Sequence, residues 1–278
     1  MTSPAINADK LTITRDNTTI LDAISLAIAP GSVVGLVGRN GAGKSSLLRC
    51  LAGLVEPDSG SSSLLGCPSL ELSDAVRARI GYVAQAPDLL EWMNVYEHLC
   101  LVGRAYPAWN EQRCLLLAAR FELPLGKAVR ELSGGDQQKM AVVLALAHDP
   151  DLLLLDEPVS SLDPLARQEF MRAMFGAFDT ERERTVVISS HILTDLERVV
   201  SHVAFMKHGA LQLFDAWDAM LEYLRLAPST TNVPDAALVQ RAPGSATMVV
   251  DIRHAPGAAS ADTGKAMTLT ELFAELNK

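Results

Sequence analysis

The sequence has 278 residues, of which 49% are hydrophobic and 21% charged, which allows one large α/β domain with a sizeable core and a smaller appendage. The net charge of −9 argues against a nucleic-acid partner, because affinity for a phosphate backbone depends on clustered Lys and Arg. No run reaches about 18 apolar residues, and residues 1–7 have neither the basic start nor the apolar stretch of a signal peptide, so we expect a cytoplasmic chain.

A glycine-rich loop separates the first expected parallel strand, residues 32–37, from a helix that starts near residue 46. Glycines let consecutive backbone N–H groups turn toward a phosphate chain, and the positive end of the helix points at the same anion. We expect Lys44 to reach the β- and γ-phosphates and Ser45 to offer its hydroxyl to Mg²⁺. The alternative is a glycine-rich turn that binds nothing. The expected nucleotide contacts in this loop are Gly38, Asn40, Gly41, Ala42, Gly43, Lys44, Ser45 and Ser46.

A second anion site is expected where a turn made of Ser133, Gly134 and Gly135 opens a helix. It follows another helical pattern over residues 111–123, which stops near a proline. One γ-phosphate cannot easily use both half-sites within one small domain, so the economical inference is a head-to-tail dimer in which each ATP is shared between chains. The alternative is that Ser133 is only a helix N-cap, which needs no ATP.

Two acidic residues follow an uninterrupted apolar run at residues 152–155, which is typical of a strand buried on both faces. In an open α/β sheet, ligands bind at the carboxyl ends of the strands. Phosphoryl transfer needs both charge neutralisation and an in-line nucleophile. We therefore expect Asp156 to bind Mg²⁺, directly or through water, and Glu157 to act on the attacking water. The alternative is a solvated acidic turn.

The tail beyond residue 214 has weaker patterns. Residues 215–225 are typical of an amphipathic helix, and residues 228–234 of a break rich in Pro, Ser and Thr. Residues 246–252 are typical of a strand, residues 257–264 of a loop, and residues 268–276 of a closing helix. The tail can also be interpreted as a packing or dimer-stabilising appendage.

Taken together, the order and spacing of these segments resemble the ATP-binding subunit of an ABC transporter over about residues 8–215. The resemblance implies an α/β fold of the P-loop NTPase class, with a mostly parallel sheet, a helical subdomain and a small α+β extension. Residues 1–85 and 147–214 are expected to form the nucleotide-binding core. Residues 86–146 form the expected helical subdomain. It carries the turn of Ser133, Gly134 and Gly135, which matches the signature turn of the family. Residues 215–278 form the expected C-terminal extension.

Three further site residues are implied by the resemblance. Gln85 matches the Q-loop glutamine, which touches Mg²⁺ or the attacking water and senses the membrane partner. Asp163, in the segment Ser160-Ser161-Leu162-Asp163, matches the loop that crosses the dimer interface. His191, after an apolar strand over residues 185–189, matches the switch histidine that contacts the γ-phosphate. A lone glutamine or histidine is usually structural, so these assignments depend on the position of each residue within the set.

The resemblance also implies the activity. Two Mg·ATP bind at the interface of two subunits, and hydrolysis drives a separate integral membrane permease that holds the chain at the inner face of the membrane. The second subunit is another copy or a related ATPase subunit. The tail resembles those of exporters of lipids, drugs and antimicrobial peptides. The alternative is a soluble ATPase of this class that remodels a macromolecular complex, which the single cassette and the absence of sustained heptads disfavour.

Two positions depart from the family pattern. No aromatic residue precedes Tyr82 to stack on adenine, and Arg15 occupies the corresponding position, where it either stacks on the base or is a solvated surface charge. We expect weak discrimination between bases. Asp136 stands where the signature commonly has glutamine, and a negative charge near a phosphate is unfavourable unless it points away.

The segment of residues 87–99 resembles the region where a cytoplasmic helix of the permease docks. Trp92 and Met93 offer large adaptable apolar area and are expected to contribute to docking, whereas Tyr96 is expected to be part of the core. At helical spacing, all three could also be core.

Overall fold

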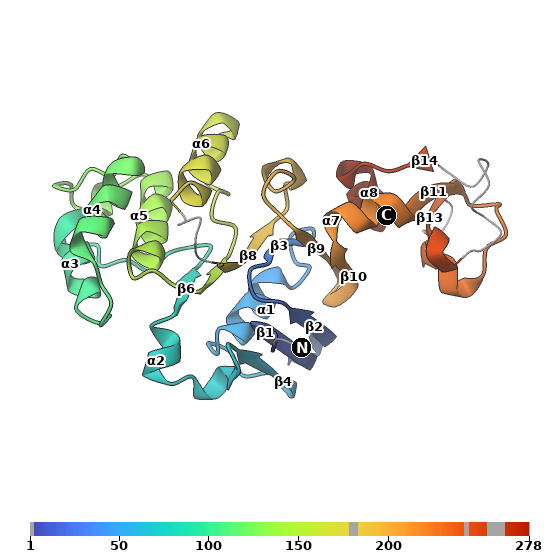
Figure 1. Cartoon of the computed structure of the whole chain (residues 1–278), viewed down its shortest axis with the longest axis horizontal. Helices are drawn as coiled ribbons and strands as arrows, with labels where there is room; N and C mark the ends of the chain where they lie inside the picture. Colours follow the sequence, from blue (N-terminus) through green and yellow to red (C-terminus); the bar gives the residue numbers. More distant parts are fainter. Residues whose placement is uncertain (1–2, 178–182, 242–244, 255–264, 278) are drawn as a thin grey trace.

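The computed structural model describes residues 3–177, 183–241, 245–254 and 265–277 (Figure 1). Its centre is a six-stranded sheet with the order β10-β9-β3-β8-β7-β6, in which neighbouring strands are parallel except for the antiparallel edge strand β10. Strands β7 and β8 consist entirely of buried residues, as expected for strands covered on both faces. The strands are β3 (Val33–Val37), β6 (Ile80–Val83), β7 (Leu152–Leu155), β8 (Thr185–Ser190), β9 (His202–Lys207) and β10 (Ala210–Ala216).

A separate antiparallel sheet, which the sequence analysis did not anticipate, covers one side of the core. Its order is β2-β1-β4-β5. Asp16 and Asn17 connect its two long strands with positive φ angles of 49° and 60°, the conformation that a tight hairpin turn requires and that these residue types tolerate. Helix α1 (Lys44–Leu51) packs its buried leucines into the apolar cluster shared by the two sheets. The strands are β1 (Ile6–Arg15), β2 (Thr18–Ile28), β4 (Ser59–Leu64) and β5 (Cys67–Pro68).

The helical part between β6 and β7 begins each of its longer helices at a side-chain cap, a position where a short polar side chain accepts a hydrogen bond from an otherwise unpaired backbone N–H group. The helix expected over residues 111–123 ends earlier, at Arg120, because Glu122 has a positive φ of 56°. The helices of this part are α3 (Val95–Gly103), α4 (Glu111–Arg120) and α5 (Gly134–Ala147). Helix α2 (Asp74–Arg77) precedes β6, and α6 (Pro164–Phe175) follows β7.

The tail forms a small α+β unit at one end of the molecule, coloured orange to red in Figure 1. The helix expected over residues 215–225 is shorter, because its first residues complete β10 and its last begin a strand that pairs with β13. The loop expected over residues 257–264 lies outside the described residues. The tail elements are α7 (Trp217–Tyr223), β11 (Leu224–Pro228), β12 (Leu238–Gln240), β13 (Thr247–Asp251), β14 (Lys265–Ala266) and α8 (Leu269–Leu276).

Tyr96 corrects one expectation about the core. It is 42% exposed, and its hydroxyl donates a hydrogen bond of 2.8 Å to Glu111. The buried face of α3 instead carries Val95 and Leu99, and Tyr96 falls on the other side of the helix. Trp92 is 75% exposed, so its expected part in docking stays a prediction.

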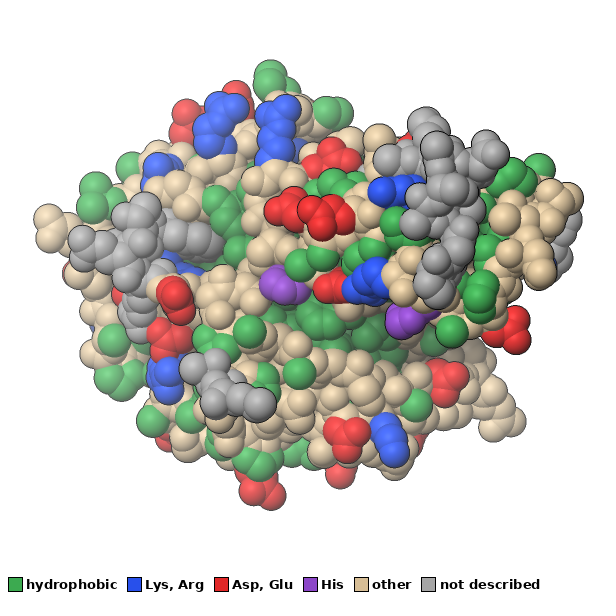
Figure 2. Space-filling model, turned by 45° about the vertical axis from the view of Figure 1, so that its right-hand side comes forward, with side chains coloured by type: hydrophobic (Ala, Val, Ile, Leu, Met, Phe, Trp, Pro, Cys, Tyr) green, Lys and Arg blue, Asp and Glu red, His purple; other side chains and the backbone are tan. Residues whose placement is uncertain are grey.

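The face shown in Figure 2 carries charges of both signs among hydrophobic side chains. On the described part of the face in Figure 2, Lys and Arg side chains are scattered among Asp and Glu without forming a continuous basic area. Among the described residues, the helices are too short or too polar for any of them to be a candidate membrane span.

Candidate functional site

The glycine-rich loop leaves the end of β3 and enters α1 with a backbone that side chains would obstruct. A Cβ at Gly38 would stand 2.5 Å from the Met206 carbonyl oxygen, and one at Gly43, whose φ is +99°, would stand 2.7 Å from the Ile20 carbonyl oxygen. Glycine is needed at both positions because no side chain can be accommodated. The two glycines therefore let the loop lie close to these carbonyls at the start of α1, where a helix offers N–H groups to an anion.

This loop borders an open cavity of about 420 Å³. The cavity brings together residues that are far apart in the sequence, since Gln85 and Glu157 line it opposite the loop. Arg15, Asp163 and the signature turn are not among its lining residues. The lining consists of Ile20, Asn40, Gly41, Ala42, Gly43, Lys44, Ser45, Ser46, Gln85 and Glu157.

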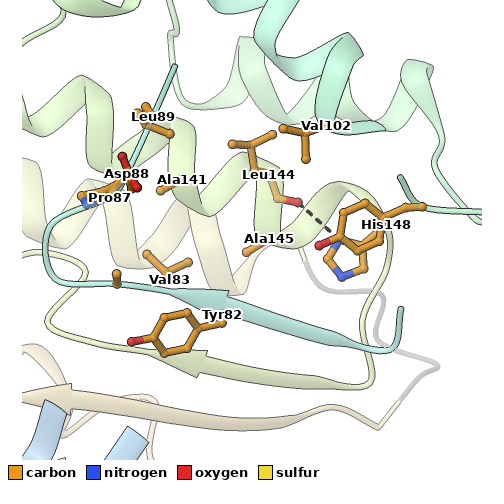
Figure 3. A pocket seen from close by; sticks show the side chains of 12 residues that line it. Tyr82, Val83, Pro87, Asp88, Leu89, Val102, Ala141, Leu144, Ala145 and His148 are labelled. Carbon is orange, nitrogen blue, oxygen red and sulfur yellow. Dashed lines mark hydrogen bonds between the residues drawn. The ribbon is translucent and has the colours of Figure 1, made fainter. Parts of the chain in front are cut away.

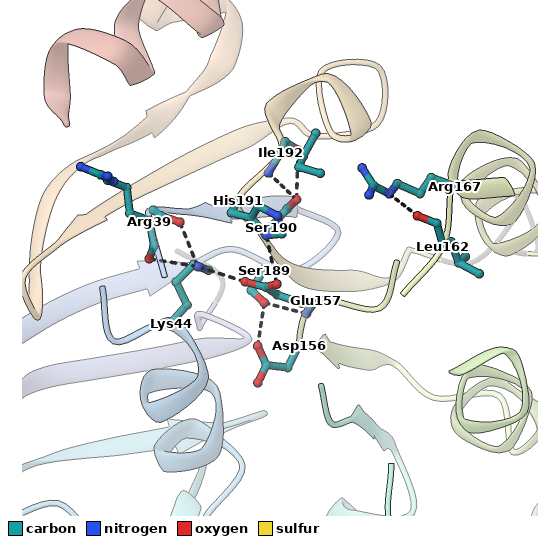
Figure 4. Close-up of polar contacts among 11 residues, drawn as sticks. Arg39, Lys44, Asp156, Glu157, Leu162, Arg167, Ser189, Ser190, His191 and Ile192 are labelled. Carbon is teal, nitrogen blue, oxygen red and sulfur yellow. Dashed lines mark hydrogen bonds and ion pairs between the residues drawn. The ribbon is translucent and has the colours of Figure 1, made fainter. Parts of the chain in front are cut away.

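Lys44 is buried and lies at the centre of this cluster (Figure 4). Its ammonium donates hydrogen bonds of 2.9 Å to the Gly38 carbonyl and 3.3 Å to the Arg39 carbonyl. It also forms an ion pair of 3.2 Å with Glu157 Oε1, whose side chain is equally buried. Without its partner, either charge would be costly at such a buried position. The loop and the end of β7 are thus held together through one cation.

Asp156 and Glu157 follow β7 and are organised by one hydroxyl of the neighbouring strand (Figure 4). Ser189, in β8, donates a hydrogen bond of 2.7 Å to Asp156 Oδ1 and accepts one of 2.8 Å from the Glu157 backbone N–H. Glu157 has a positive φ of 45°, which for a residue of this kind costs on the order of 1–3 kcal/mol. The Ser189 hydroxyl therefore fixes both acids at the carboxyl edge of the sheet, including one in an unfavourable backbone conformation.

His191 completes the cluster from the loop after β8. Its Nδ1 lies 3.0 Å from Glu157 Oε2, and its side chain is 38% exposed. Glu157 thus contacts Lys44 with one oxygen and His191 with the other. Each ring nitrogen of a histidine can carry a proton, so the second nitrogen is available to another group.

The residues expected to bind Mg²⁺ supply the oxygen ligands that this ion prefers. Asp156 is completely buried, and its Oδ2 has no hydrogen-bond partner among the described residues. Buried polar atoms in native proteins are nearly always paired with protein, water or an ion. Ser45 and Gln85 both line the cavity. A single carboxylate with a hydroxyl and an amide fits Mg²⁺, which keeps several waters and binds substrate phosphates.

The signature turn opens α5 at some distance in sequence and outside this cavity. Ser133 caps the helix by accepting a 3.1 Å hydrogen bond from the Asp136 N–H, and its hydroxyl donates one of 2.8 Å to the Asp136 carboxylate. The Asp136 carboxylate therefore points toward Ser133, not away from it. A Cβ on Gly135 would stand 2.7 Å from the Leu162 side chain, and one on Gly134 would be 3.9 Å from Ser161. The turn thus lies beside the segment that leads to Asp163.

Two other expected nucleotide contacts have protein partners of their own. Asp163 caps α6, accepting hydrogen bonds of 3.0 Å from the N–H groups of Leu165 and Ala166. Arg15 has a side chain that is 57% exposed and lies 3.6 Å from Asp58. The structure thus shows an exposed Arg15 that does not line the cavity, and its contact with adenine stays a prediction.

Sequence reasoning missed two contributors to the site. The sequence pattern predicts Ser189 only as part of a strand, although a pair of serines that ends an apolar strand is a visible signal. Ile20 lines the cavity from β2, and its carbonyl approaches Gly43, which reflects a contact between two sheets that local patterns do not reveal.

Comparison with known proteins matches this arrangement to one family. A family model described as ABC transporter matches residues 21–160. The "Nod factor export ATP-binding protein I" of Paraburkholderia xenovorans (strain LB400) is 35% identical over 75% of this chain and 70% of its own length. Its counterpart from Cupriavidus metallidurans is also 35% identical, over 68% of this chain and 64% of its own length. The alignments thus span about two thirds of these curated relatives.

Solved structures agree with the family match. An ATP-binding subunit of an ABC transporter superposes with a TM-score of 0.70 at 27% identity, covering 78% of this chain and 92% of that one. An ATP-binding cassette in a dimeric post-hydrolysis state, bound to ADP and Pi, shares the fold with a TM-score of 0.68 at 24% identity. The match covers 76% of this chain and 98% of that one. With the phosphate loop, the acidic strand end and these relatives in agreement, the chain belongs to the ABC transporter family as an ATP-binding subunit that hydrolyses ATP.

Proposed function

We propose that this subunit drives export through an integral membrane permease, with Mg·ATP bound between two ATP-binding subunits. The observation that carries the site assignment is the contact chain from the buried Lys44 through the buried Glu157 to His191, which joins the phosphate loop to the ends of two central strands. The direction of transport follows from the names of the curated relatives, which describe an export ATP-binding protein.

Within the site, each side chain has a role that its position supports. Lys44 binds the β- and γ-phosphates, and Glu157 orients the attacking water and accepts its proton. His191 offers a ring nitrogen to the γ-phosphate. Ser45, Gln85 and Asp156 hold Mg²⁺, which neutralises phosphate charge when bound.

Nucleotide binding must rearrange the contact chain. The Lys44 ammonium is 3.2 Å from Glu157, so a phosphate that attracts Lys44 competes with this ion pair. Glu157 then becomes available for water, with His191 still beside it. ATP thereby creates the competent arrangement of its own site.

The second half-site comes from another subunit. Ser133, Gly134 and Gly135 are at the start of α5 and outside the cavity, which suits a contact with the γ-phosphate held by a partner. Asp163 follows the segment beside that turn and would cross the same interface. Closure is favoured while the γ-phosphate bridges the halves and is lost after hydrolysis. The partner is a second copy or a related ATPase subunit.

The permease holds the subunit at the inner, cytoplasmic face of the membrane. Trp92, exposed shortly before α3, and the partly buried Met93 supply an adaptable apolar contact for it. Purification from membranes in mild detergent should recover a polytopic membrane protein in stoichiometric amount. Recovery of soluble partners only would contradict the transport assignment.

Glu157→Gln tests the catalytic assignment. This change keeps the size of the side chain but removes the charge that accepts a proton, so ATP hydrolysis should fall by at least about 100-fold. ATP binding should persist, and a stable dimer should accumulate in sedimentation experiments with Mg·ATP. Hydrolysis at the wild-type rate would show that Glu157 is not the base.

A further inference from the structure

Two buried oxygen atoms near the nucleotide site lack hydrogen-bond partners among the described residues. They are Oδ2 of Asp156 and the hydroxyl oxygen of Tyr82. Leaving a buried polar group unpaired destabilises the protein, and such atoms in native proteins usually bind a water or an ion. Tyr82 has no role in the site described above.

Strand register places both side chains on the same face of the sheet. Tyr82 in β6 is paired with Leu154 in the parallel strand β7. Side chains alternate along a strand, so Asp156, two residues after Leu154, continues on the face of Leu154 and Tyr82. Tyr82 and Leu154 pack in the same apolar cluster with Leu48 of α1. The tyrosine therefore lies between the metal-binding carboxylate and the helix that follows the phosphate loop.

The tyrosine is directed toward the edge where the nucleotide binds. Figure 3 shows its ring on the opposite side of β6 from Val83 and its hydroxyl pointing toward the end of the strand where Pro87 lies. A cavity of about 290 Å³ occupies the Val83 side. Gln85, expected to touch Mg²⁺, comes three residues after Tyr82 in the same segment.

The electrostatic surroundings keep the hydroxyl protonated. Burial raises the pKa of Tyr82 above its ordinary value, the Arg49 guanidinium of α1 opposes this rise, and the nearby Asp156 carboxylate adds to it by a smaller amount. A protonated phenol is a hydrogen-bond donor as well as an acceptor. Tyr82 can therefore donate to a water that also contacts Asp156.

We propose that Tyr82 is a positioning residue of the nucleotide site, whose hydroxyl and Asp156 Oδ2 together hold a water molecule of the Mg²⁺ shell. The inference rests on the proposed function, because it requires Mg²⁺ at Asp156. Residues that orient a metal-bound group through a hydrogen bond typically change metal affinity more than they change the fold.

The test compares Tyr82→Phe with Tyr106→Phe, which removes a hydroxyl from another partly buried tyrosine in the helical part. Binding of a fluorescent ATP analogue is titrated in EDTA and at increasing Mg²⁺ concentration. Tyr82→Phe should bind the analogue in EDTA within about twofold of wild type, while the Mg²⁺ concentration for half-maximal enhancement rises about three- to tenfold, the effect of one lost hydrogen bond. Tyr106→Phe should match wild type.

Thermal unfolding provides a second readout. Because the hydroxyl is unpaired in the nucleotide-free protein, Tyr82→Phe should leave its melting temperature unchanged or raise it, while the increase caused by Mg·ATP becomes smaller. A structure of the wild type with Mg²⁺ and a non-hydrolysable ATP analogue should show the water between Tyr82 and Asp156.

Equal Mg²⁺ titrations for the two tyrosine variants, or a hydroxyl bonded only to Arg49 in that structure, would overturn the inference while leaving the proposed function intact. If the wild type itself binds ATP without any response to Mg²⁺, the proposed metal site fails first. The two failures are therefore distinguishable.

Discussion

At the scale of single residues, the site depends on a few buried polar atoms, each of which is held by one particular hydrogen-bond or ion-pair partner. The Ser189 hydroxyl serves both Asp156 Oδ1 and the Glu157 backbone N–H, and Glu157 is held in a left-handed conformation. Lys44 balances the Glu157 charge inside the protein. Small changes here should therefore affect catalysis and folding together.

Ser189→Ala leaves the Glu157 N–H and one Asp156 oxygen without their partner. We expect the free energy of unfolding to fall by about 1–3 kcal/mol and the ATPase rate to fall by about 10- to 100-fold. Urea denaturation and a steady-state ATPase assay measure the two effects. Ser69→Ala is the matched control, because the buried Ser69 hydroxyl has no partner among the described residues, and this variant should behave like wild type. Equal behaviour of both variants would contradict the role of Ser189.

At the scale of elements, α5 connects the signature turn to the central sheet. The helix starts at the Ser133 cap and packs closely against β6, where Gly81 provides the necessary space. Its position therefore determines where the signature turn, the proposed second half-site, stands relative to the cavity.

Gly81→Ala should disturb this packing. The added Cβ would stand 2.7 Å from the Ala145 backbone oxygen and 2.6 Å from the Leu153 side chain. Since the Ala145 backbone atom cannot move without shifting α5, we expect the free energy of unfolding, measured by urea denaturation, to fall by about 1–3 kcal/mol. Gly126→Ala, at a position with open space, is the control and should be nearly neutral. A stable Gly81→Ala variant would show that α5 can move away from the sheet at little cost.

Asp136→Asn should separate two effects at the start of α5. The free energy of unfolding of the monomer should fall by about 0.3–1 kcal/mol, because a carboxylate in the first turn interacts favourably with the helix dipole. In a Glu157→Gln background, ATP-dependent dimerisation should become about two- to tenfold tighter, because the change removes a negative charge beside the γ-phosphate contact of the proposed dimer. Sedimentation equilibrium measures the second effect. Asp74→Asn, at the start of α2, is the control and should leave dimerisation unchanged. Weaker dimerisation of Asp136→Asn would show that the Asp136 charge favours the dimer.

At the scale of the whole molecule, the tail is attached to the core through both apolar and charged contacts. Phe273 of α8 lies 6.5 Å from Phe205 of β9, ring centre to ring centre. Arg253 lies over the Tyr223 ring at 3.3 Å and forms ion pairs of 2.7 Å with Asp251 and 3.5 Å with Asp215 of β10. The tail is thus packed on the edge of the nucleotide-binding sheet.

This attachment should weaken in acid. Burial opposes ionisation of Asp215, but hydrogen bonds from Tyr223 and a backbone N–H, together with Arg253, hold its pKa below the ordinary value. A lowered pKa in the folded protein gives stability that is present above the unfolded pKa of about 3.9 and is lost as the pH falls below it. Hydrogen exchange of tail amides, corrected for intrinsic rates, should therefore accelerate below about pH 4 more than exchange in β7 and β8.

Arg253→Ala is the companion variant. It should raise hydrogen exchange in the tail already at neutral pH and reduce its dependence on acid. Arg225→Ala should keep that dependence, because among the described residues it loses bonds only to the Leu221 and Leu224 carbonyls. An unchanged pH response in Arg253→Ala would show that the charged cluster does not hold the tail.

The sequence by itself determined the fold class, the family and the positions of β3, β7 and β8, because an apolar run followed by glycines or acids is a local signal of a buried strand that ends at a ligand edge. The roles of the individual site residues remain proposals.

Only the tertiary structure decided how the polar groups are paired. The Ser189 contacts, the Lys44–Glu157 ion pair and the exposure of Tyr96 depend on which strands and helices become neighbours, and this is fixed by packing across distant segments. The sequence patterns also predicted the ends of α4 and α7 incorrectly. A positive φ at Glu122 ends α4, and the pairing of β11 with β13 ends α7, in spite of helical propensity. The local sequence pattern indicates which side chains of a segment can be buried, whereas long-range packing determines which other segments they contact.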